Sequence, residues 1–408
     1  MNRQKTLKRI AYLTLAVIIA AMMTATVLEK IHGTDFALRW VYHNPVFIVL
    51  WGVAAVAGMW LLLSRTDARR QPCSVLLHVA LVLILAGALV THLCGLGGVI
   101  HLREGEPTAA FELDDESPAT LPFTLELKEF RIEYDPGTRN VSDYISELTV
   151  REPGEERDVT ISMNHILKYR GYRFYQADYD EDGLGSILAV SRDPVGVGIT
   201  YTGYLLLLVS MIGYFFQKDS LFRSARQAIR RRRPAGRKRH AVPVVLGLAG
   251  CALLLLWWLD AFPKGPLMPV LRSPLLFLHM IPIMVSYALF ALLALLGVAG
   301  LLVKEEASER LHNVGLVILY PAVFLLTFGT FLGAVWANIS WGNYWAWDPK
   351  ETWALVTLLV YSLPLHGRAI PAFDRPRVFH LFMIIAILCV LVTYFGVNML
   401  LGGMHSYA

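Results

Sequence analysis

"SPLLFLHMIPIMVSYALFALLALLGVAGLLV", residues 273–303, contains no charged side chain over its whole length. A helix needs about 20 apolar residues to cross a bilayer, so this run is long enough to span one. The rest of the chain has a similar character. It is 55% hydrophobic and only 17% charged over 408 residues, and its mean hydropathy is +0.50. This composition indicates a polytopic membrane protein and is rare among soluble domains.

About nine apolar runs are long enough, or nearly long enough, to cross a bilayer. The first run lacks a small-residue cleavage site and is followed by further runs, so we expect an anchor rather than a cleaved signal. We therefore predict a polytopic α-helical membrane protein of about nine transmembrane helices. The runs lie near residues 10–28, 45–63, 75–95, 196–216, 241–259, 275–303, 313–335, 350–366 and 378–400.

The loops between these runs differ in charge. About 22 of the 37 lysines and arginines lie in the first residues and in every second loop, against about five in the loops on the other side. Because Lys and Arg are enriched on the cytoplasmic side, the N-terminus is expected inside and the C-terminus outside. The Arg-rich segment 217–240 then links four helices to five in the cytoplasm. Its charge also suits nucleic acid, but beside a membrane helix an anchored linker is favoured.

A domain outside the membrane is predicted between the third and fourth helices. "FTLELKEFRIEY" (123–134) alternates apolar and polar side chains, as a half-buried strand does. Further strands are expected at 143–150, 168–179 and 186–192, with Pro-Gly and Asp-Gly turns between strands. The predicted organisation is 1–98 for helices one to three, 99–195 for a small β-rich domain, 196–216 for the fourth helix, 217–240 for the linker and 241–408 for the C-terminal bundle.

"WANISWGNYWAWDPKETW", residues 336–353, holds five of the ten tryptophans. Indoles favour the membrane surface, and such a belt explains two or three of them. A membrane belt does not explain five tryptophans in one short segment that also contains Tyr344. If the segment is helical, Trp341 and Trp345 share a face. We predict an aromatic shelf for a large flat ligand, formed by Trp336, Trp341, Trp345, Trp347 and Trp353.

Asp348, Pro349 and Glu351 have the pattern of a helix start. Asp is a good N-cap, Pro suits the first helical position, and Glu three residues after the cap completes a capping box. The two acidic residues are thus expected to begin the eighth helix. The same helix start offers backbone N–H groups to an anionic ligand group such as a propionate. The structural and ligand-binding roles of Asp348 are compatible.

The histidines can be sorted by depth in the membrane. His78 and His366 lie at the cytoplasmic level, and His279 and His405 lie at the outer level, beside the tryptophans. A single interfacial histidine is usually a solvated or hydrogen-bonded residue, but polar groups within membrane helices are often functional. At the same levels there are two rivals, His92 outside and His380 inside, and position alone does not exclude them.

A flat aromatic surface with two imidazoles at its level is suited to haem, which takes axial nitrogens above and below its iron. A zinc site requires a tighter cluster with more protein ligands. The four cysteines are Cys73, Cys94, Cys251 and Cys389. They form neither a C-x-x-C pair nor a C-x-x-C-H motif, so this chain has no redox couple of its own and no covalent haem site. We expect ordinary packing roles for them.

Several segments of the sequence resemble segments of known protein families. "WGNYWAWDPKETWAL" (341–355) resembles the tryptophan-rich WWD signature of membrane haem-handling proteins, and "GGMHSYA" (402–408) resembles the C-terminus of CcsA-type proteins. "LLHVALVLILAGALV" (76–90), "GGVIHLREGE" (97–106) and "NHILKYRGYRFYQADY" (164–179) resemble the ResB/CcsB family. The chain is thus similar to a fusion of the two halves of a system II cytochrome c synthase, although its outer domain is shorter than is usual for ResB.

The resemblance implies a holocytochrome c synthase of the haem-lyase type in a bacterial inner membrane, active on the extracytoplasmic face. His78 and His366 would ligate haem b at a site on the cytoplasmic side, and His279 and His405 would ligate it outside, over the tryptophan segment. A separate apocytochrome c would bring a C-x-x-C-H motif whose thiols add to the haem vinyl groups. A thioredoxin-like reductase is implied as a partner, because the thiols must be reduced.

Three alternatives remain open from the sequence. A haem transporter or chaperone could deliver haem to a separate ligase, since the WWD signature also occurs in such proteins. An ion- or proton-coupled transporter could use the membrane histidines, although few acidic residues lie within the apolar runs. A scaffold could use its tryptophans only as anchors. Bound haem in the purified protein would exclude the last two.

Overall fold

The computed structural model describes residues 2–64, 71–231, 273–367 and 369–401. Seven of its helices are long and apolar enough to cross a membrane. The predicted run near 241–259 lies outside the described residues, and so does the linker beyond Arg231. The predicted run 350–366 forms a shorter helix, α10, followed by one 3-10 turn, η4. A membrane protein with a β domain is thus confirmed, while the number of nine helices and their orientation stay predictions.

The helices and their bounds follow the predicted apolar runs closely. Proline often occupies the first helical position, where it costs no hydrogen bond. The bundle consists of α1 (Asn2–His32), α3 (Pro45–Leu63), α4 (Pro72–Cys94), α5 (Pro194–Phe216), α8 (Pro274–Leu302), α9 (Glu305–Ser340), α10 (Pro349–Ser362) with η4 (Leu363–His366), and α11 (Pro376–Leu391) with η6 (Val392–Leu401). Short connecting elements are α2 (Thr34–Ala37), η1 (Leu38–Tyr42), α6 (Leu221–Arg231) and η5 (Pro371–Asp374).

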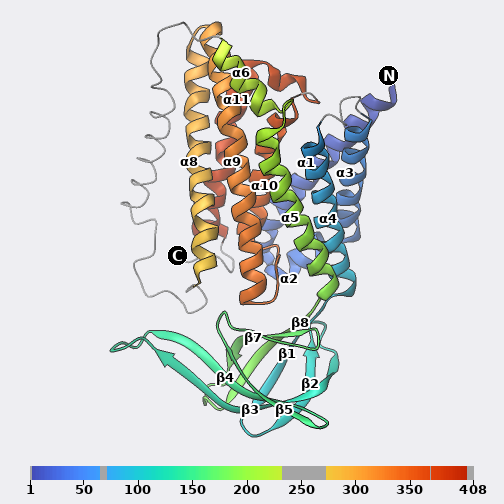
Figure 1. Ribbon diagram of the computed structural model, residues 1–408, viewed down its shortest axis with the longest axis vertical. Coiled ribbons are helices and arrows are strands. Elements are labelled where there is room, and N and C mark those ends of the chain that lie inside the picture. Colours follow the sequence, from blue (N-terminus) through green and yellow to red (C-terminus); the bar gives the residue numbers. More distant parts are fainter. Residues whose placement is uncertain (1, 65–70, 232–272, 368, 402–408) are drawn as a thin grey trace.

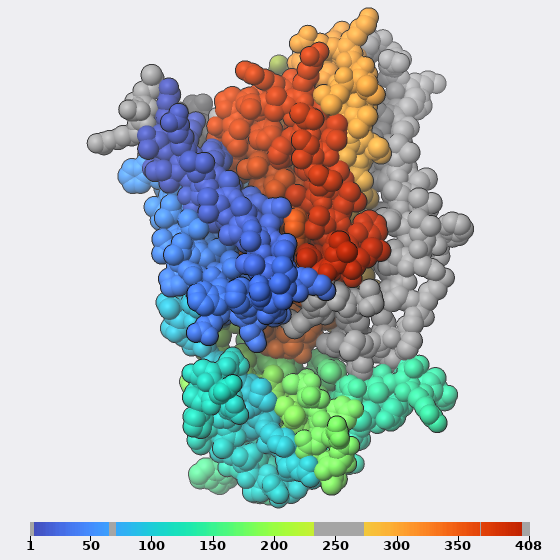
Figure 2. Space-filling model, turned by 180° about the vertical axis from the view of Figure 1, so that it is seen from behind, coloured from blue at the N-terminus to red at the C-terminus, as the bar shows by residue number. Residues whose placement is uncertain are grey.

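The N-terminal and C-terminal helices form one bundle. Helix α4 packs along α5, α8 packs along α9 and α11, and α1 contacts α10. Close approach of α4 and α5 requires small residues, because a Cβ at Gly87 would stand 2.2 Å from the Thr200 hydroxyl oxygen. The space-filling view shows the first helices, in blue, lying against the last ones, in red (Figure 2). Residues from both ends of the sequence therefore share one interior.

The domain between α4 and α5 is a single antiparallel sheet of eight strands, in the order β5-β4-β3-β2-β1-β8-β7-β6. Its two ends approach each other, since β5 contacts β6 and β7, and its interior is filled by apolar side chains such as Leu125, Leu148 and Phe174. The strands are β1 (Leu96–Arg103), β2 (Pro107–Leu113), β3 (Pro118–Tyr134), β4 (Val141–Glu152), β5 (Glu155–Ser162), β6 (Leu167–Tyr169), β7 (Tyr172–Tyr179) and β8 (Gly185–Arg192).

The predicted β-rich domain is confirmed, with two differences. The expected strand 168–179 is a tight hairpin, because Arg170 and Gly171 both take positive φ angles, 50° and 82°, and turn the chain between β6 and β7. The sheet also begins earlier than residue 99, at Leu96. The strands β1, β2 and β5 were not among those predicted.

The β sheet lies at one end of the helical bundle (Figure 1). Helix α4 leads into β1, and β8 leads into α5. We call this end of the bundle the sheet end, and the opposite one the far end. The last turn of α9 and the first turn of α10 lie at the sheet end, whereas the start of α4, helix α6 and η4 lie at the far end.

Candidate functional site

The tryptophan segment is not one continuous helix. Helix α9 ends at Ser340 and α10 begins at Pro349, with non-helical chain between them. Trp341 and Trp345 therefore do not share a helical face. Instead, Trp341 lies edge-on to the buried Trp336, with ring centroids 4.9 Å apart, and Trp345 lies perpendicular to Trp347 at 5.8 Å. The indoles thus form two perpendicular pairs.

Trp347 is held in a conformation that is unusual for a large side chain. Its φ angle is +58°, in the left-handed region. Its ring stacks on Tyr42 with centroids 4.6 Å apart and an interplanar angle of 9°, and Phe47 approaches it edge-on at 5.6 Å. Tyr42 is in turn within 3.3 Å of the Thr352 hydroxyl. Contacts from the first 50 residues thus offset the backbone strain of this tryptophan.

Asp348 begins α10 as predicted. Its Oδ1 accepts a hydrogen bond from the Lys350 backbone N–H at 2.8 Å, and Pro349 occupies the first helical position. Glu351 departs slightly from the expected capping box, because its Oε2 accepts from the Ala346 N–H at 2.9 Å. The two carboxylates therefore tie the end of the loop to the helix start.

His279 lies against the last turns of α9. Its Nδ1–H donates to the Gly329 carbonyl oxygen at 2.7 Å, so in the neutral ring the lone pair is on Nε2. A Cβ at Gly333 would stand 2.4 Å from this ring, so the helix surface is shaped around the imidazole. Leu275, Leu276 and Met280, from the same turns of α8, pack with Trp336 and Trp341. His279 is thus close to the first indole pair. His405, its expected partner, lies outside the described residues.

His78 and His366 come together at the far end of the bundle. Their ring centroids are 6.0 Å apart and their planes are nearly perpendicular, at 89°. Each Nδ1–H donates to a carbonyl oxygen one helical turn earlier, that of Ser74 at 2.7 Å and that of Ser362 at 2.9 Å. Both neutral rings therefore have the same tautomer, with the lone pair on Nε2.

The spacing of this pair can be compared with that of two ligands on one metal ion. An imidazole nitrogen binds a metal ion at about 2.0 Å and lies about 1.1 Å from its ring centre, so two rings on opposite sides of one ion have centres about 6 Å apart. The separation of His78 and His366 is of this size. The ring separation thus allows the two imidazoles to share one iron, and their role as haem ligands is a proposal.

Two family models match the chain, and together they cover most of it. A ResB-like family matches residues 55–193, and a cytochrome c assembly protein family matches residues 205–405. The chain is a ResB–CcsA fusion. His78 lies in the ResB-like half and His366 in the CcsA-type half, so the far-end pair joins the two.

Several curated proteins are similar to parts of the chain. Protein NrfI of Wolinella succinogenes is 41% identical over 152 residues, which is 35% of this chain and 17% of NrfI. Cytochrome c biogenesis protein CcsA of Parasynechococcus marenigrum is 34% identical over 180 residues, covering 35% of this chain and 58% of that protein. CcsA of Chlamydomonas reinhardtii is 35% identical over 182 residues, 39% and 50% of the two chains. The fusion thus spans about half the length of the CcsA relatives.

The rival histidines of the fusion are placed differently. His380 is fully buried, and its Nε2 lies 3.0 Å from the Ser308 carbonyl oxygen. Its ring fills the space that a side chain at Gly300 would need, so no room is left there for a porphyrin. It pairs with His312, with centroids 6.4 Å apart. His92, at the sheet end, is exposed and lies 5.2 Å from the ring of His43. The sequence analysis did not single out His312 or His43, because nothing in the local sequence distinguishes these two histidines.

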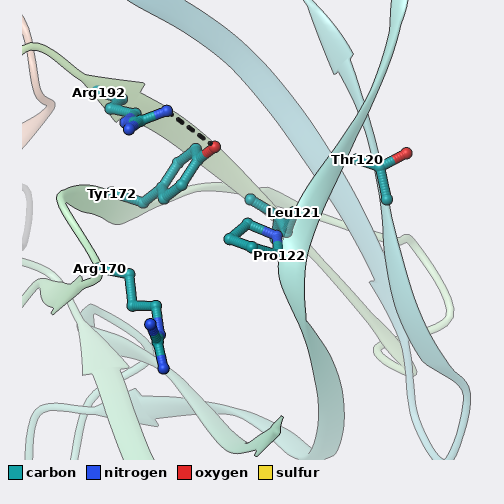
Figure 3. A pocket seen from close by; sticks show the side chains of 6 residues that line it. All are labelled: Thr120, Leu121, Pro122, Arg170, Tyr172 and Arg192. Atoms are coloured by element: carbon teal, nitrogen blue, oxygen red, sulfur yellow. Dashed lines mark hydrogen bonds between the residues drawn. The ribbon is translucent and has the colours of Figure 1, made fainter.

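The β domain has a cavity of its own. It measures about 610 Å³, and the guanidinium of Arg192 lies over the Tyr172 ring at 5.0 Å (Figure 3). Arg170, on the same wall, is paired with Glu152. The lining contains no histidine and no tryptophan. We therefore do not place the haem site in this cavity.

Proposed function

We propose that this fusion moves haem from the far end of the bundle to the sheet end and joins it there to apocytochrome c. The observation that carries the proposal is the His78–His366 pair. One imidazole comes from each half, the two share one tautomer, and their separation suits a single iron. A protein of the cytochrome c assembly family with such a pair is suited to take up haem as a substrate.

In this proposal the far end faces the cytoplasm of a bacterial inner membrane. The basic helix α6 lies there and carries arginines such as Arg223, Arg226 and Arg230, which agrees with the enrichment of Lys and Arg on the cytoplasmic side. His78 and His366 would hold incoming haem b by its iron. The sheet end would then be outside, where apocytochrome c arrives.

At the sheet end we propose His279 and His405 as the iron ligands. Trp341, Trp345 and Trp347 would contact the faces and edges of the macrocycle, because indole rings favour such flat apolar surfaces. The buried Trp336 would support Trp341 from inside the bundle. Asp348, which accepts from the Lys350 N–H, would hold the start of α10 beside the haem. These residues would hold the haem in one orientation while its vinyl groups react.

The reaction itself is an addition. Each thiol of the C-x-x-C-H motif forms a carbon–sulfur bond to one vinyl carbon, and its proton ends on the other, so no oxidant or reductant is consumed. The thiols must arrive reduced. The cysteines that the structure describes, Cys73, Cys94 and Cys389, form no disulfide, so a separate thioredoxin-like reductase is the proposed source of electrons.

A second candidate is a haem transporter or chaperone that delivers haem to a separate ligase. It needs only the far-end pair for haem uptake, and the WWD signature also occurs in proteins of that kind. Such a protein would bind haem but would not join it to a co-expressed apocytochrome. An ion-coupled transporter or a scaffold would bind no haem at all.

The test uses the full chain, expressed with a C-x-x-C-H apocytochrome and purified in detergent. We would record the haem absorption spectrum and stain the cytochrome for covalent haem after denaturing electrophoresis. Native protein should show both signals, and His279→Ala or His405→Ala should lower covalent staining at least about tenfold. His101→Ala, in the β domain, is the matched control. Haem without covalent staining would favour the carrier, and a native chain without haem would contradict the proposal.

A further inference from the structure

A buried amide anchors the tryptophan segment to the β domain, beside a hydrogen bond from the Ser340 hydroxyl to Asn164 at 2.9 Å. The Asn338 side chain is 2% exposed, on the last turn of α9. Its Oδ1 accepts from the Arg173 guanidinium of β7 at 2.6 Å and from the Tyr201 hydroxyl of α5 at 3.1 Å. No ion pair between Arg173 and a carboxylate occurs in the part of the chain that the structure describes. The charge of Arg173 is thus directed at this amide oxygen, which makes the contact charge-assisted.

The same amide fixes the start of the loop. The Asn338 Nδ2–H donates to the Gly342 carbonyl oxygen at 3.2 Å, while the Tyr175 hydroxyl donates to the Asn338 carbonyl oxygen at 3.1 Å. Gly342 has a φ of +85°, and a Cβ there would stand 2.5 Å from the Tyr175 ring. Strand β7 therefore lies directly against the turn between Trp341 and Trp345.

A second contact holds the middle of the loop. The Tyr344 hydroxyl lies 2.8 Å from the Thr91 Oγ1, and the Thr91 hydroxyl donates to Asp193 at 2.5 Å. Because that hydroxyl hydrogen is used, the Tyr344 O–H must donate to Thr91. Asp193 also caps α5, by accepting from the Gly196 N–H at 2.9 Å. The loop is thus tied to the point where the last strand becomes a membrane helix.

We propose that Arg173 and Asn338 are positioning residues through which the β domain of the ResB-like half holds the tryptophan loop in its haem-receiving conformation. The inference rests on the proposed function. Among the residues that the structure describes, Arg173 contacts no proposed ligand and no indole, so it acts through its neighbours Asn338 and Tyr175. Loss of the contact releases the loop turn at Gly342 but leaves the far-end pair, His78 and His366, in place.

The test compares Arg173→Met with the native chain, in cells that also make the apocytochrome. Two quantities are measured, haem bound per chain and the fraction of cytochrome that carries covalent haem. We expect covalent attachment to fall about tenfold in Arg173→Met, because a charge-assisted hydrogen bond is lost. The haem bound at the far end should stay within about twofold of native. Arg173→Lys, which keeps a cationic donor, should restore much of the attachment.

Two further variants define the mechanism. Asn338→Asp keeps the acceptor for Arg173 and should retain more attachment than Asn338→Leu, which keeps no polar atom. The matched control is Arg131→Met, which removes another arginine of the β domain, one paired with Glu147. Combining Arg173→Met with Asn338→Leu should cost little more than Asn338→Leu alone, because that change already removes the acceptor of the Arg173 hydrogen bond.

The outcomes separate the inference from the function on which it rests. If native protein attaches haem and Arg173→Met behaves like Arg131→Met, the inference is wrong and the function stands. If haem content and attachment fall together in Arg173→Met, the role is general folding and the inference is also wrong. If native protein attaches no haem, the function fails. Hydrogen exchange of residues 341–348 then decides the inference, which requires faster exchange in Arg173→Met and is overturned by unchanged exchange.

Discussion

Single residues show how far depth in the membrane can be predicted. Charge and hydropathy placed His78 and His366 at one level, and in the structure their rings lie 6.0 Å apart. The same reasoning placed His380 at that level too, but did not show that its ring is enclosed beside Gly300. Burial of a single side chain depends on which helices touch, and hydropathy carries no such information. The role of the pair as iron ligands stays a prediction.

Removing one imidazole of the far-end pair should lower the haem content of the purified protein. In His78→Ala or His366→Ala the iron would lose one of two axial bonds, so we expect at least about a tenfold loss of bound haem. Absorption spectra of protein purified at equal concentration measure this loss. Added imidazole should restore part of it, since a free ring can take the vacated position.

The matched control for this change is His312→Ala. It removes another imidazole paired in the far half of the bundle, but one outside the proposed site. Equal haem loss in His312→Ala and His78→Ala would argue that packing, rather than ligation, explains the effect.

At the scale of elements, the clearest patterns gave the most accurate predictions. Long apolar runs predicted the helices to within a few residues at many of their ends, and alternation predicted β3, β4 and β8. The strand β5 was missed because its first four residues, Glu155 to Asp158, are all exposed and charged. The conformation of 341–348 was left open, because spacing alone cannot separate a short helix from extended chain. Its shape depends on Tyr42, which is distant in the sequence, and on Asn338, which belongs to the preceding helix α9.

The β domain should become less stable in acid. Hydrogen bonds from Arg103 and His101 hold the pKa of Asp180 below its ordinary value, and a hydrogen bond from Arg103 does the same for Asp182. A carboxyl with a lowered folded-state pKa stabilises the fold above its unfolded value of about 3.9, and this contribution is lost as pH falls through the folded pKa.

We therefore expect the unfolding midpoint of the β domain to fall below about pH 4. Arg103→Met should lower the midpoint at pH 7, and this difference should shrink as the pH falls through the lowered pKa values of the two carboxyls, where they become protonated in the native protein too. Thermal unfolding followed by far-ultraviolet circular dichroism at several pH values measures both curves. A constant difference between them at all pH values would exclude this ion-pair explanation.

The whole molecule shows why the two halves occur together. The Trp353 Nε1–H donates to the Thr26 hydroxyl at 3.1 Å, Tyr42 stacks on Trp347, and Arg173 bonds Asn338. These contacts join the halves at the sheet end, and the contact between His78 and His366 joins them at the far end. The match to two family models indicated the division, but sequence alone could not show that the tryptophan loop depends on residues from the other half.

A break in the chain within 232–240 should therefore leave the halves associated. When they are co-expressed as two polypeptides with a tag on the first, we expect most of the second to co-purify. Replacing Tyr42 and Thr26 by alanine in the tagged half should lower the recovered amount of the second. Recovery of the tagged half alone would show that covalent linkage, and not these contacts, keeps the halves together.

The contact between Tyr42 and Trp347 also has a consequence for biogenesis. The ribosome makes the first 50 residues long before the tryptophan loop. Tyr42 and Phe47 are therefore synthesised about 300 residues before Trp347, the side chain that they contact. The same delay applies to His78, whose counterpart is His366. A nascent chain therefore has no complete pair of far-end imidazoles. If the pair binds haem as proposed, haem capture follows translation rather than accompanying it.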